Sequence, residues 1–156
     1  MLRPARPEDA DALAGILRAA MREAMPWLPD LHTPDDDRRF LREIVLPEKE
    51  VWVAENGGVI AGFTALGTRG GVEFMEHLYV APEHQRRGIG TALMEKAKTR
   101  RSAGFRLWVF QRNGGARDFY EHHGLRLVEL TDGSGNEEKE PDALYEWSGA
   151  RPNSAG

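Results

Sequence analysis

The chain has 156 residues, no cysteine and a net charge of −4, with 21 lysines and arginines against 25 acidic residues. This length predicts one domain, and 40% apolar residues suffice for a hydrophobic core. The acidic balance argues against nucleic-acid binding, and the lack of cysteine excludes disulfides and thiolate chemistry. No apolar run is long enough for a signal peptide or membrane span, so we expect a cytoplasmic domain that contacts no membrane.

The N-terminal segment predicts a short strand followed by an amphipathic helix. Residues 2–5 carry the strand, and RPEDADALAGILRAAM follows it, with Pro7 in the first turn and acidic residues near the positive end of the helix dipole. The apolar residues of this helix recur at a spacing of three to four and form one stripe: Leu13, Ile16, Leu17 and Met21.

A second helix is predicted after Pro26 and Pro29, which break the first. Thr33 suits its N-cap, and Asp36 occupies the capping-box position, although the usual residue there is Glu or Gln. Pro47 is expected to end it.

The middle of the chain predicts three strands. VWVAENGGVIAGFTAL predicts two strands joined by a hairpin turn at Asn56-Gly57-Gly58. GVEFMEHLYVAP follows as a third strand. Its apolar residues occupy both alternating faces, with Phe74, Leu78 and Val80 on one and Met75 and Tyr79 on the other. We therefore expect a central strand that is covered on both sides.

The C-terminal half alternates helices and strands. GIGTALMEKAKTRRSAG is expected to be a helix and FRLWVF a strand, and GGARDFYEHHG is expected to be a short helix. LRLVEL and ALYEW then form a last strand pair around the polar, mobile-looking loop TDGSGNEEKEPD. Residues 149–156 are expected to be a disordered tail. The order of elements predicts a mixed α/β domain with antiparallel hairpins and one strand–helix–strand crossover.

The stretch HQRRGIG, at the expected start of a helix, has the features of an anion site. A helix N-terminus leaves N–H groups unpaired, and the glycines let an anion approach the backbone closely. Leu93 stands where a dinucleotide fingerprint needs its third glycine, and no Gly-Lys-Ser/Thr of a Walker A loop follows. The alternative interpretation is a capped turn with solvated arginines.

Two segments resemble a known family. LYVAPEHQRRGIGTALM is similar to the acetyl-coenzyme A signature of the GNAT N-acetyltransferase superfamily, with Gln85, Gly88 and Gly90 at its defined positions. LWVFQRNGGARDFYEHHGLRLV resembles the second conserved block of that family, which matches at Asn113, Ala116, Phe119, Tyr120, Glu121 and Gly124. Leu125 departs from the usual Phe, a conservative change. The order of elements agrees with the family over residues 2–147.

The resemblance implies a single GNAT domain over residues 1–148. Its fold would be a mixed, mostly antiparallel sheet of about seven strands, with about four helices on both faces and splayed central strands. The implied function is transfer of an acetyl group from acetyl-CoA to a primary amine of a small or amino-acid-like acceptor, by direct attack in a ternary complex and without a metal. The resemblance leaves a homodimer as an alternative to a monomer, since relatives are often dimers. The alternative function is a non-catalytic acyl-CoA-binding or sensing domain.

The resemblance also implies which residues hold the acyl donor. Backbone N–H groups from Arg86 to Gly90 would hold the pyrophosphate, and a backbone N–H near Leu78 would polarise the thioester carbonyl. The expected donor-binding set is Leu78, Tyr79, Val80, Gln85, Arg86, Arg87, Gly88, Ile89, Gly90, Asn113, Ala116 and Phe119. For Asn113 the alternative is a turn residue beside two glycines.

Two side chains are candidates for proton transfer. The resemblance implies Tyr120 as the acid for the departing thiolate, and an ordinary phenol stays protonated at neutral pH. Its alternative is a core aromatic beside Phe119. Glu76 is the candidate general base, because a carboxylate on a buried strand is costly unless it has a role. The alternative for Glu76 is a salt bridge with a neighbouring strand. Glu73 and His77 rank lower.

The resemblance also implies that the acceptor site lies between two loops. PWLPDLHT would supply an aromatic and apolar wall from Trp27, Leu31 and His32, and TDGSGNEEKEPD would supply the carboxylates of Glu137 and Glu138. Together they suit a cationic amine. The alternative is a solvated loop of incidental acid content. No spacing of His, Asp and Glu predicts a metal site.

Overall fold

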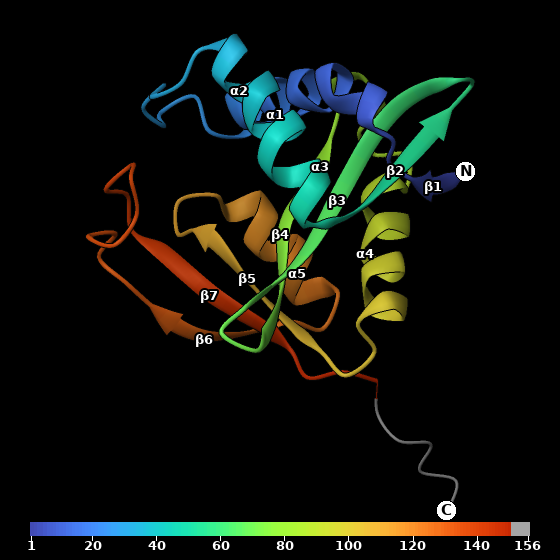
Figure 1. Cartoon of the computed structure of the whole chain (residues 1–156). Helices are drawn as coiled ribbons and strands as arrows, with labels where there is room; N and C mark the ends of the chain where they lie inside the picture. Colours follow the sequence, from blue (N-terminus) through green and yellow to red (C-terminus); the bar gives the residue numbers. More distant parts are fainter. Residues whose placement is uncertain (151–156) are drawn as a thin grey trace, which may run out of the picture.

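The structure is a computed structural model that describes residues 1–150 and contains one seven-stranded sheet (Figure 1). The strands lie in the order β1-β2-β3-β4-β5-β7-β6, and every neighbouring pair is antiparallel except β4 and β5, which are parallel. Their bounds are β1 Leu2–Pro4, β2 Glu50–Asn56, β3 Val59–Arg69, β4 Val72–Val80, β5 Phe105–Phe110, β6 Arg126–Leu130 and β7 Asp142–Trp147. The expected hairpin, crossover and final strand pair are all present.

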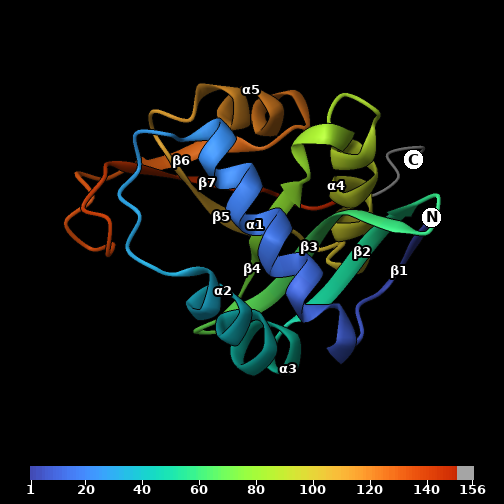
Figure 2. The same ribbon diagram turned by 90° about the horizontal axis from the view of Figure 1, so that it is seen from above.

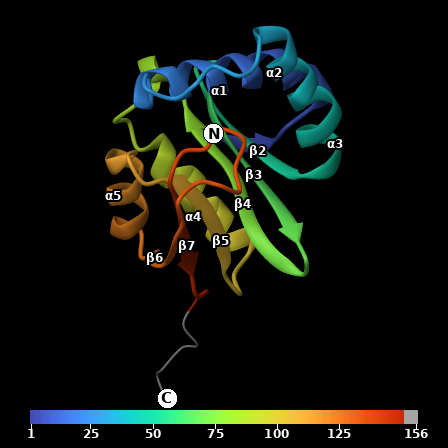
Figure 3. The ribbon, with the colours of Figure 1, turned by 90° about the vertical axis from the view of Figure 1, so that its left-hand side faces the viewer.

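Four helical segments cover the sheet. The second is continuous and consists of α2, η2 and α3; the short turns η1 and η3 precede α1 and α4. The bounds are η1 Pro7–Asp9, α1 Ala10–Ala24, α2 Pro34–Phe40, η2 Leu41–Val45, α3 Leu46–Glu48, η3 Pro82–His84, α4 Ile89–Arg100 and α5 Gly114–His122. Figure 3 shows α1, α2 and α3 on one side of the sheet and α4 and α5 on the other. The expected fold class is therefore confirmed.

The second helical segment begins as expected but extends further. The Asp36 N–H donates to Thr33 Oγ1 at 3.1 Å, and the Thr33 N–H donates to the Asp36 carboxylate at 2.9 Å, so the capping box is present. Pro47 does not end the helix, which continues to Glu48. The turn before Pro47 is π-helical, with the Leu46 N–H bonded to the Leu41 carbonyl, and this wider turn accommodates the proline.

Each side of the sheet has its own hydrophobic core. Under α1 lie its apolar stripe and the inward residues of the first strands, including the fully buried Leu13, Val53 and Phe63. Under α4 and α5 lie Leu93, Met94 and Tyr145, among others. Figure 2, seen from above, shows α1 crossing the β3–β4 part of the sheet while β5, β6 and β7 lie to one side of it.

The faces of β4 differ from the alternation predicted from sequence. The β3–β4 pairing shifts between Ala65, opposite His77, and Leu66, opposite Met75, so Glu76 is the extra residue of a β-bulge. A bulge reverses the alternation of side chains beyond it. As a result Leu78 joins Met75 in the core under α4 and α5, whereas His77 contacts the Phe40 ring on the opposite side.

The parallel strands β4 and β5 separate soon after they meet. A single register pair joins them, Phe74 with Arg106, and beyond it the strands diverge towards their C-terminal ends (Figure 1). The expected splay of the central strands is therefore present. It leaves one edge of β4 without a strand partner along the second half of its length.

The ends of the domain can be compared with the expected boundary. The Ala150 N–H donates to the Ser102 carbonyl at 2.8 Å, so ordered chain continues two residues past position 148. The remainder of the expected tail, residues 151–156, lies outside the described residues. Within residues 1–150 no helix is both long and apolar enough to span a bilayer.

Candidate active site

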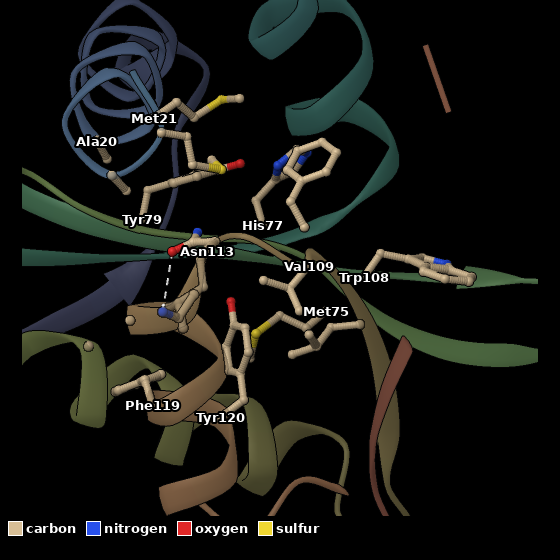
Figure 4. A pocket seen from close by; sticks show the side chains of 18 of the residues that line it. Ala20, Met21, Met75, His77, Tyr79, Trp108, Val109, Asn113, Phe119 and Tyr120 are labelled. Atoms are coloured by element: carbon tan, nitrogen blue, oxygen red, sulfur yellow. Dashed lines mark hydrogen bonds between the residues drawn. The ribbon is translucent and has the colours of Figure 1, made fainter. Parts of the chain in front are cut away.

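The gap between β4 and β5 opens into a pocket of about 1210 Å³, called the first pocket below. Its walls come from the start of α4, the diverging halves of β4 and β5, α5, and the end of α1. Figure 4 shows its lining: Tyr120 and Phe119 rise from one side, and Met21, Tyr79 and His77 lie on the other. The pocket therefore exists because one pair of neighbouring strands fails to pair along its full length.

The backbone of β4 faces this gap at Leu78. The Thr64 hydroxyl on β3 donates to the His77 carbonyl at 2.8 Å, so the polar backbone groups of His77 point towards β3. Successive residues of a strand direct these groups to opposite sides, and those of Leu78 consequently point towards β5. No register pair links β5 to this part of β4. The N–H and carbonyl of Leu78 are thus available to a ligand.

The start of α4 presents a run of free backbone donors at one end of the first pocket. Among residues 1–150, no hydrogen-bond acceptor is found for the N–H groups of residues 86–91. Arg86 and Gly88 both adopt left-handed backbone angles, with φ of 65° and 78°. Gly88 is the N-cap of α4, and the helix dipole adds partial positive charge there. This arrangement is well suited to a phosphate group.

The helix α5 contributes Asn113 and Tyr120 to the opposite wall. The Asn113 side-chain oxygen accepts from the Ala116 N–H at 3.3 Å, so Asn113 caps α5 and also lines the pocket (Figure 4). Figure 4 shows the Tyr120 hydroxyl directed into the pocket. Burial raises the pKa of Tyr120 above its ordinary value, with a further contribution from Tyr79. Tyr120 is therefore a protonated hydroxyl at neutral pH, available as a donor.

Glu76 lines the first pocket, but its carboxylate is paired. The Arg69 Nε donates to Glu76 Oε1 at 2.9 Å, a second guanidinium nitrogen contacts Oε2, and the Lys49 Nζ lies 3.9 Å from Oε1. The Glu76 side chain is only 6% exposed. Of the two interpretations that the sequence left open, this geometry matches the salt bridge with a neighbouring strand.

His77 and Tyr79 occupy the side of β4 that faces α1 and α2. Burial lowers the pKa of His77 to about 4, so its imidazole is neutral at pH 7. Its Nδ1 is buried and has no hydrogen-bond partner within residues 1–150. Burial raises the pKa of Tyr79 to about 12, and the negative charge of Glu138 adds to this shift. Both groups are uncharged at neutral pH.

A second pocket of about 1060 Å³ lies beside the first, under α1 and α2. Leu31, His32, Glu137 and Glu138, four of the five residues expected to bind an acceptor, line it. The two predicted loops meet there through a contact between His32 Nε2 and the Glu137 carboxylate. This carboxylate raises the pKa of His32.

Two of the predicted site residues lie elsewhere. Trp27 is absent from the lining of the second pocket; the guanidinium of Arg112 lies 4.0 Å from its ring centroid, and its ring meets that of Phe110 edge-on. Arg87 is absent from the lining of the first pocket. The other eleven residues of the expected donor-binding set all line that pocket.

Sequence reasoning missed several lining residues, among them Met21, Met25 and Phe110. Met21 was assigned to the apolar stripe of α1, where its spacing matches core residues equally well. Met25 is the C-cap of α1 and Phe110 is the last residue of β5, and no local signal distinguishes a pocket wall from a core wall at such positions. In the part of the chain described, no cluster of His, Asp and Glu side chains could hold a metal ion.

Known proteins share both sequence and fold with the chain. Residues 47–126 match the family described as "Acetyltransferase (GNAT) domain". The chain is 35% identical over 90 residues to the peptidyl-lysine N-acetyltransferase YiaC of Escherichia coli, a match that covers 58% of this chain and 59% of that protein. It is 36% identical over 116 residues to an uncharacterized N-acetyltransferase of Archaeoglobus fulgidus, covering 65% of this chain and 77% of that protein.

Solved structures of N-acetyltransferases share the fold of this chain. The PaiA N-acetyltransferase of Thermoplasma acidophilum, solved in complex with coenzyme A, superposes with a TM-score of 0.73. The alignment covers 95% of this chain and 98% of that one, with 20% sequence identity. The family match includes β4, the start of α4 and α5, the elements that form the first pocket. The chain therefore belongs to the GNAT acetyltransferase family.

Proposed function

We propose that the protein transfers an acetyl group from acetyl-CoA to a primary amine. The observation that carries this proposal is the convergence of three features on the first pocket. These are the free N–H groups at the start of α4, the unpaired backbone edge of β4 at Leu78, and the protonated hydroxyl of Tyr120. Acyl transfer from a thioester needs a site for the pyrophosphate, a polarised carbonyl and a proton for the thiolate.

Each feature has one role in the proposal. The N–H groups of residues 86–91 hold the pyrophosphate, and the Leu78 N–H donates to the thioester oxygen as negative charge develops on it. Tyr120 gives its proton to the departing sulfur. Asn113 lines the donor site with its amide nitrogen while its oxygen caps α5. Because both oxygens of Glu76 are engaged by Arg69, the proposal assigns Glu76 to bracing β4 and not to proton abstraction.

The amine would enter through the second pocket. Its lining has six carboxylates against three arginines, and two of these arginines, Arg18 and Arg22, already pair with aspartates. Leu31, Phe40 and Ile44 give its mouth an exposed apolar wall. This combination favours a cation on an apolar stem, such as an alkylamine or an amino-acid-like amine. The name of the relative YiaC supports a lysine side chain in a peptide as a second acceptor class.

The test is release of free thiol from acetyl-CoA across a panel of amines. The panel contains alkylamines, amino acids and lysine-containing peptides, and a chromogenic disulfide reports coenzyme A. Because the protein has no cysteine, the enzyme adds no background to this signal. We expect amine-dependent turnover by the wild type. Tight binding of acetyl-CoA without turnover on any amine would refute acetyl transfer and favour the alternative of a sensing domain.

A further inference from the structure

The two pockets adjoin through a small set of shared lining residues. The residues that line both are Met21, Met25, His77, Tyr79, Phe110 and Glu138. An acceptor nitrogen in the second pocket must pass this junction to reach a thioester in the first. Glu138 is the single carboxylate among the six. It comes from the β6–β7 loop (residues 131–141), far in sequence from the other five.

We infer that Glu138 is the general base that takes a proton from the acceptor's ammonium group. This inference rests on the proposed function, since it concerns the same acetyl transfer. It differs from the expectation drawn from sequence, in which Glu138 only attracted a cationic substrate. It also differs from the candidate base on β4, Glu76, which the structure holds in an ion pair.

The β6–β7 loop holds Glu138 in a defined position. The Asn136 side-chain amide donates to the Glu140 carbonyl at 2.8 Å and lies 3.2 Å from Asp142. At Gly133, with φ of 82°, a Cβ would stand 2.3 Å from the carbonyl carbon of Glu140, so the backbone closes tightly there. These contacts join the two ends of the loop, whose polar composition predicts mobility.

The acidic side chains around Glu138 contact other side chains, whereas Glu138 has no side-chain partner within the described residues. Glu137 contacts His32, and Glu140 pairs with Arg112 at 2.9 Å. Apart from the backbone N–H of Glu138 itself, no hydrogen-bond or ion-pair partner of the Glu138 side chain is found within residues 1–150. A carboxylate that faces a pocket without a cation is free to receive one, and an ammonium group supplies both the charge and the proton.

The electrostatic surroundings of Glu138 favour proton uptake. Burial raises the pKa of Glu138 above its ordinary value, and the nearby negative charges of Glu137 and Asp142 raise it further. A hydrogen bond from its own backbone N–H and the positive charge of His32 oppose this effect and lower the pKa. From β4, Tyr79 is neutral at physiological pH and adds no charge. Such a carboxylate is more basic than an exposed one, which favours the role of a general base.

The other ionisable groups at the junction are poorer bases. Burial lowers the pKa of His77 to about 4, so its imidazole holds a proton less readily than a solvated one. Burial raises the pKa of Tyr79 to about 12, so its hydroxyl stays protonated. Among the lining residues that the two pockets share, Glu138 alone combines a free lone pair with raised basicity.

The proton balance of the reaction closes with Glu138 and Tyr120. Glu138 takes one proton from R–NH3+ and becomes a neutral carboxylic acid. The amine nitrogen then forms a bond to the thioester carbon, the C–S bond breaks, and Tyr120 protonates the sulfur. The nitrogen loses its second proton to water on becoming an amide, and the Tyr120 phenolate takes one proton back from water, so Tyr120 is restored. Glu138 returns its own proton to water.

The experiment compares Glu138→Gln with wild type on the best amine from the panel, from pH 6 to 10. In the wild type, kcat/KM is level between the pKa of Glu138 and that of the amine. Without the base only neutral amine reacts, so kcat/KM of the variant rises about tenfold per pH unit until the amine is deprotonated. We expect a loss of about 100-fold at pH 7 that shrinks as the pH rises.

Glu137→Gln is the matched control, because Glu137 is the adjacent carboxylate, carries the same charge and does not line the first pocket. Because Glu137 lines the second pocket and contacts His32, its loss can change KM, but we expect the variant to keep the level pH profile of kcat/KM. If Glu138 only attracted the cation, Glu138→Gln would raise KM, leave kcat unchanged and keep the wild-type profile. That result would overturn the inference.

Two further results separate the failure of this inference from failure of the proposed function. A wild type that transfers acetyl groups, with a Glu138→Gln variant equal to it at every pH, overturns the assignment of Glu138 alone. A wild type that is stabilised by acetyl-CoA but acetylates no amine overturns both. Equal melting temperatures of the two proteins exclude a folding defect as the cause of a kinetic loss.

Discussion

Gly88→Val is the sharpest perturbation of the donor site. Gly88 has φ of 78° and caps α4, where the free N–H groups of residues 86–91 begin to point along the helix axis. A Cβ at this position would meet nothing within 4 Å, so the substitution introduces no collision. Its effect comes from the backbone angle, which a β-branched residue adopts at a cost of roughly 1–2 kcal/mol or more. The loop is therefore expected to turn away from this conformation.

The expected weakening of acetyl-CoA binding follows from the hydrogen bonds that the displaced loop would lose. Loss of one bond from a backbone N–H group to a pyrophosphate, at about 1.5–3 kcal/mol, corresponds to a Kd that is roughly 10- to 100-fold higher. At an acetyl-CoA concentration of 100 times the wild-type Kd, the wild type gains about 2.7 kcal/mol. For a 100-fold weaker variant the gain is about 0.4 kcal/mol. In a domain of this size the shift in melting temperature falls from about 5–11 °C to about 1–2 °C.

Thermal unfolding with and without acetyl-CoA measures this difference. Gly88→Asn is the control, because Asn tolerates left-handed angles far better than Val does. We expect the Asn variant to retain most of the ligand-induced shift. An equal shift for Gly88→Val and wild type would show that the pyrophosphate does not lie on the start of α4, and would refute the reasoning.

Four other variants test single contacts. Tyr120→Phe should lower kcat by roughly 10²- to 10⁴-fold in the thiol-release assay with KM unchanged, and an unchanged kcat would remove Tyr120 as the acid. Thr64→Val removes the side-chain hydrogen bond to the His77 carbonyl and should lower the free energy of unfolding by about 0.5–1.5 kcal/mol in urea titrations. Lowering the pH from about 6.5 to about 4 should lower the free energy of unfolding of the wild type. The unfolded chain binds a proton on His77 in this range, whereas burial keeps the folded imidazole neutral. In His77→Gln the free energy of unfolding should depend less on pH over the same range. Glu76→Gln should lower the free energy of unfolding by about 1–3 kcal/mol. It should change kcat far less than the loss of a general base would. A loss of about 100-fold in kcat with unchanged stability would instead identify Glu76 as the base.

Local signals predicted the elements of the fold well. The cap at Thr33 depends only on residues within one helical turn, and the apolar stripe of α1 repeats at helical spacing. Both can be read along the chain because the interacting groups are close in sequence. The extension of the helix past Pro47 was missed, since a π-helical turn has no sequence signature as clear as a proline.

The pockets were less accessible to sequence reasoning, because they depend on contacts between distant segments. The resemblance correctly brought the loops of His32 and Glu137 together across 105 positions. It also suggested Trp27, whose ring instead packs against Phe110 and Arg112. An aromatic residue between two prolines can turn either way, and only the packed neighbours decide its direction. The same holds for Met21, which periodicity assigns to the core.

The bulge at Glu76 explains why the faces of β4 were predicted wrongly, and it also shapes the two pockets. Without the extra residue, strict alternation would place Met75, His77 and Tyr79 on one face and Leu78 on the other. With it, Met75 and Leu78 share the face of Tyr120, while His77 and Tyr79 share the face of the second pocket. The two pockets can thus meet across a single strand. The ion pair with Arg69 and Lys49 compensates the buried charge of the inserted residue and holds the bulge in place. Glu76, for which the sequence left a general base and a salt bridge open, is in this structure the ion-paired residue of the bulge on the strand between the two pockets.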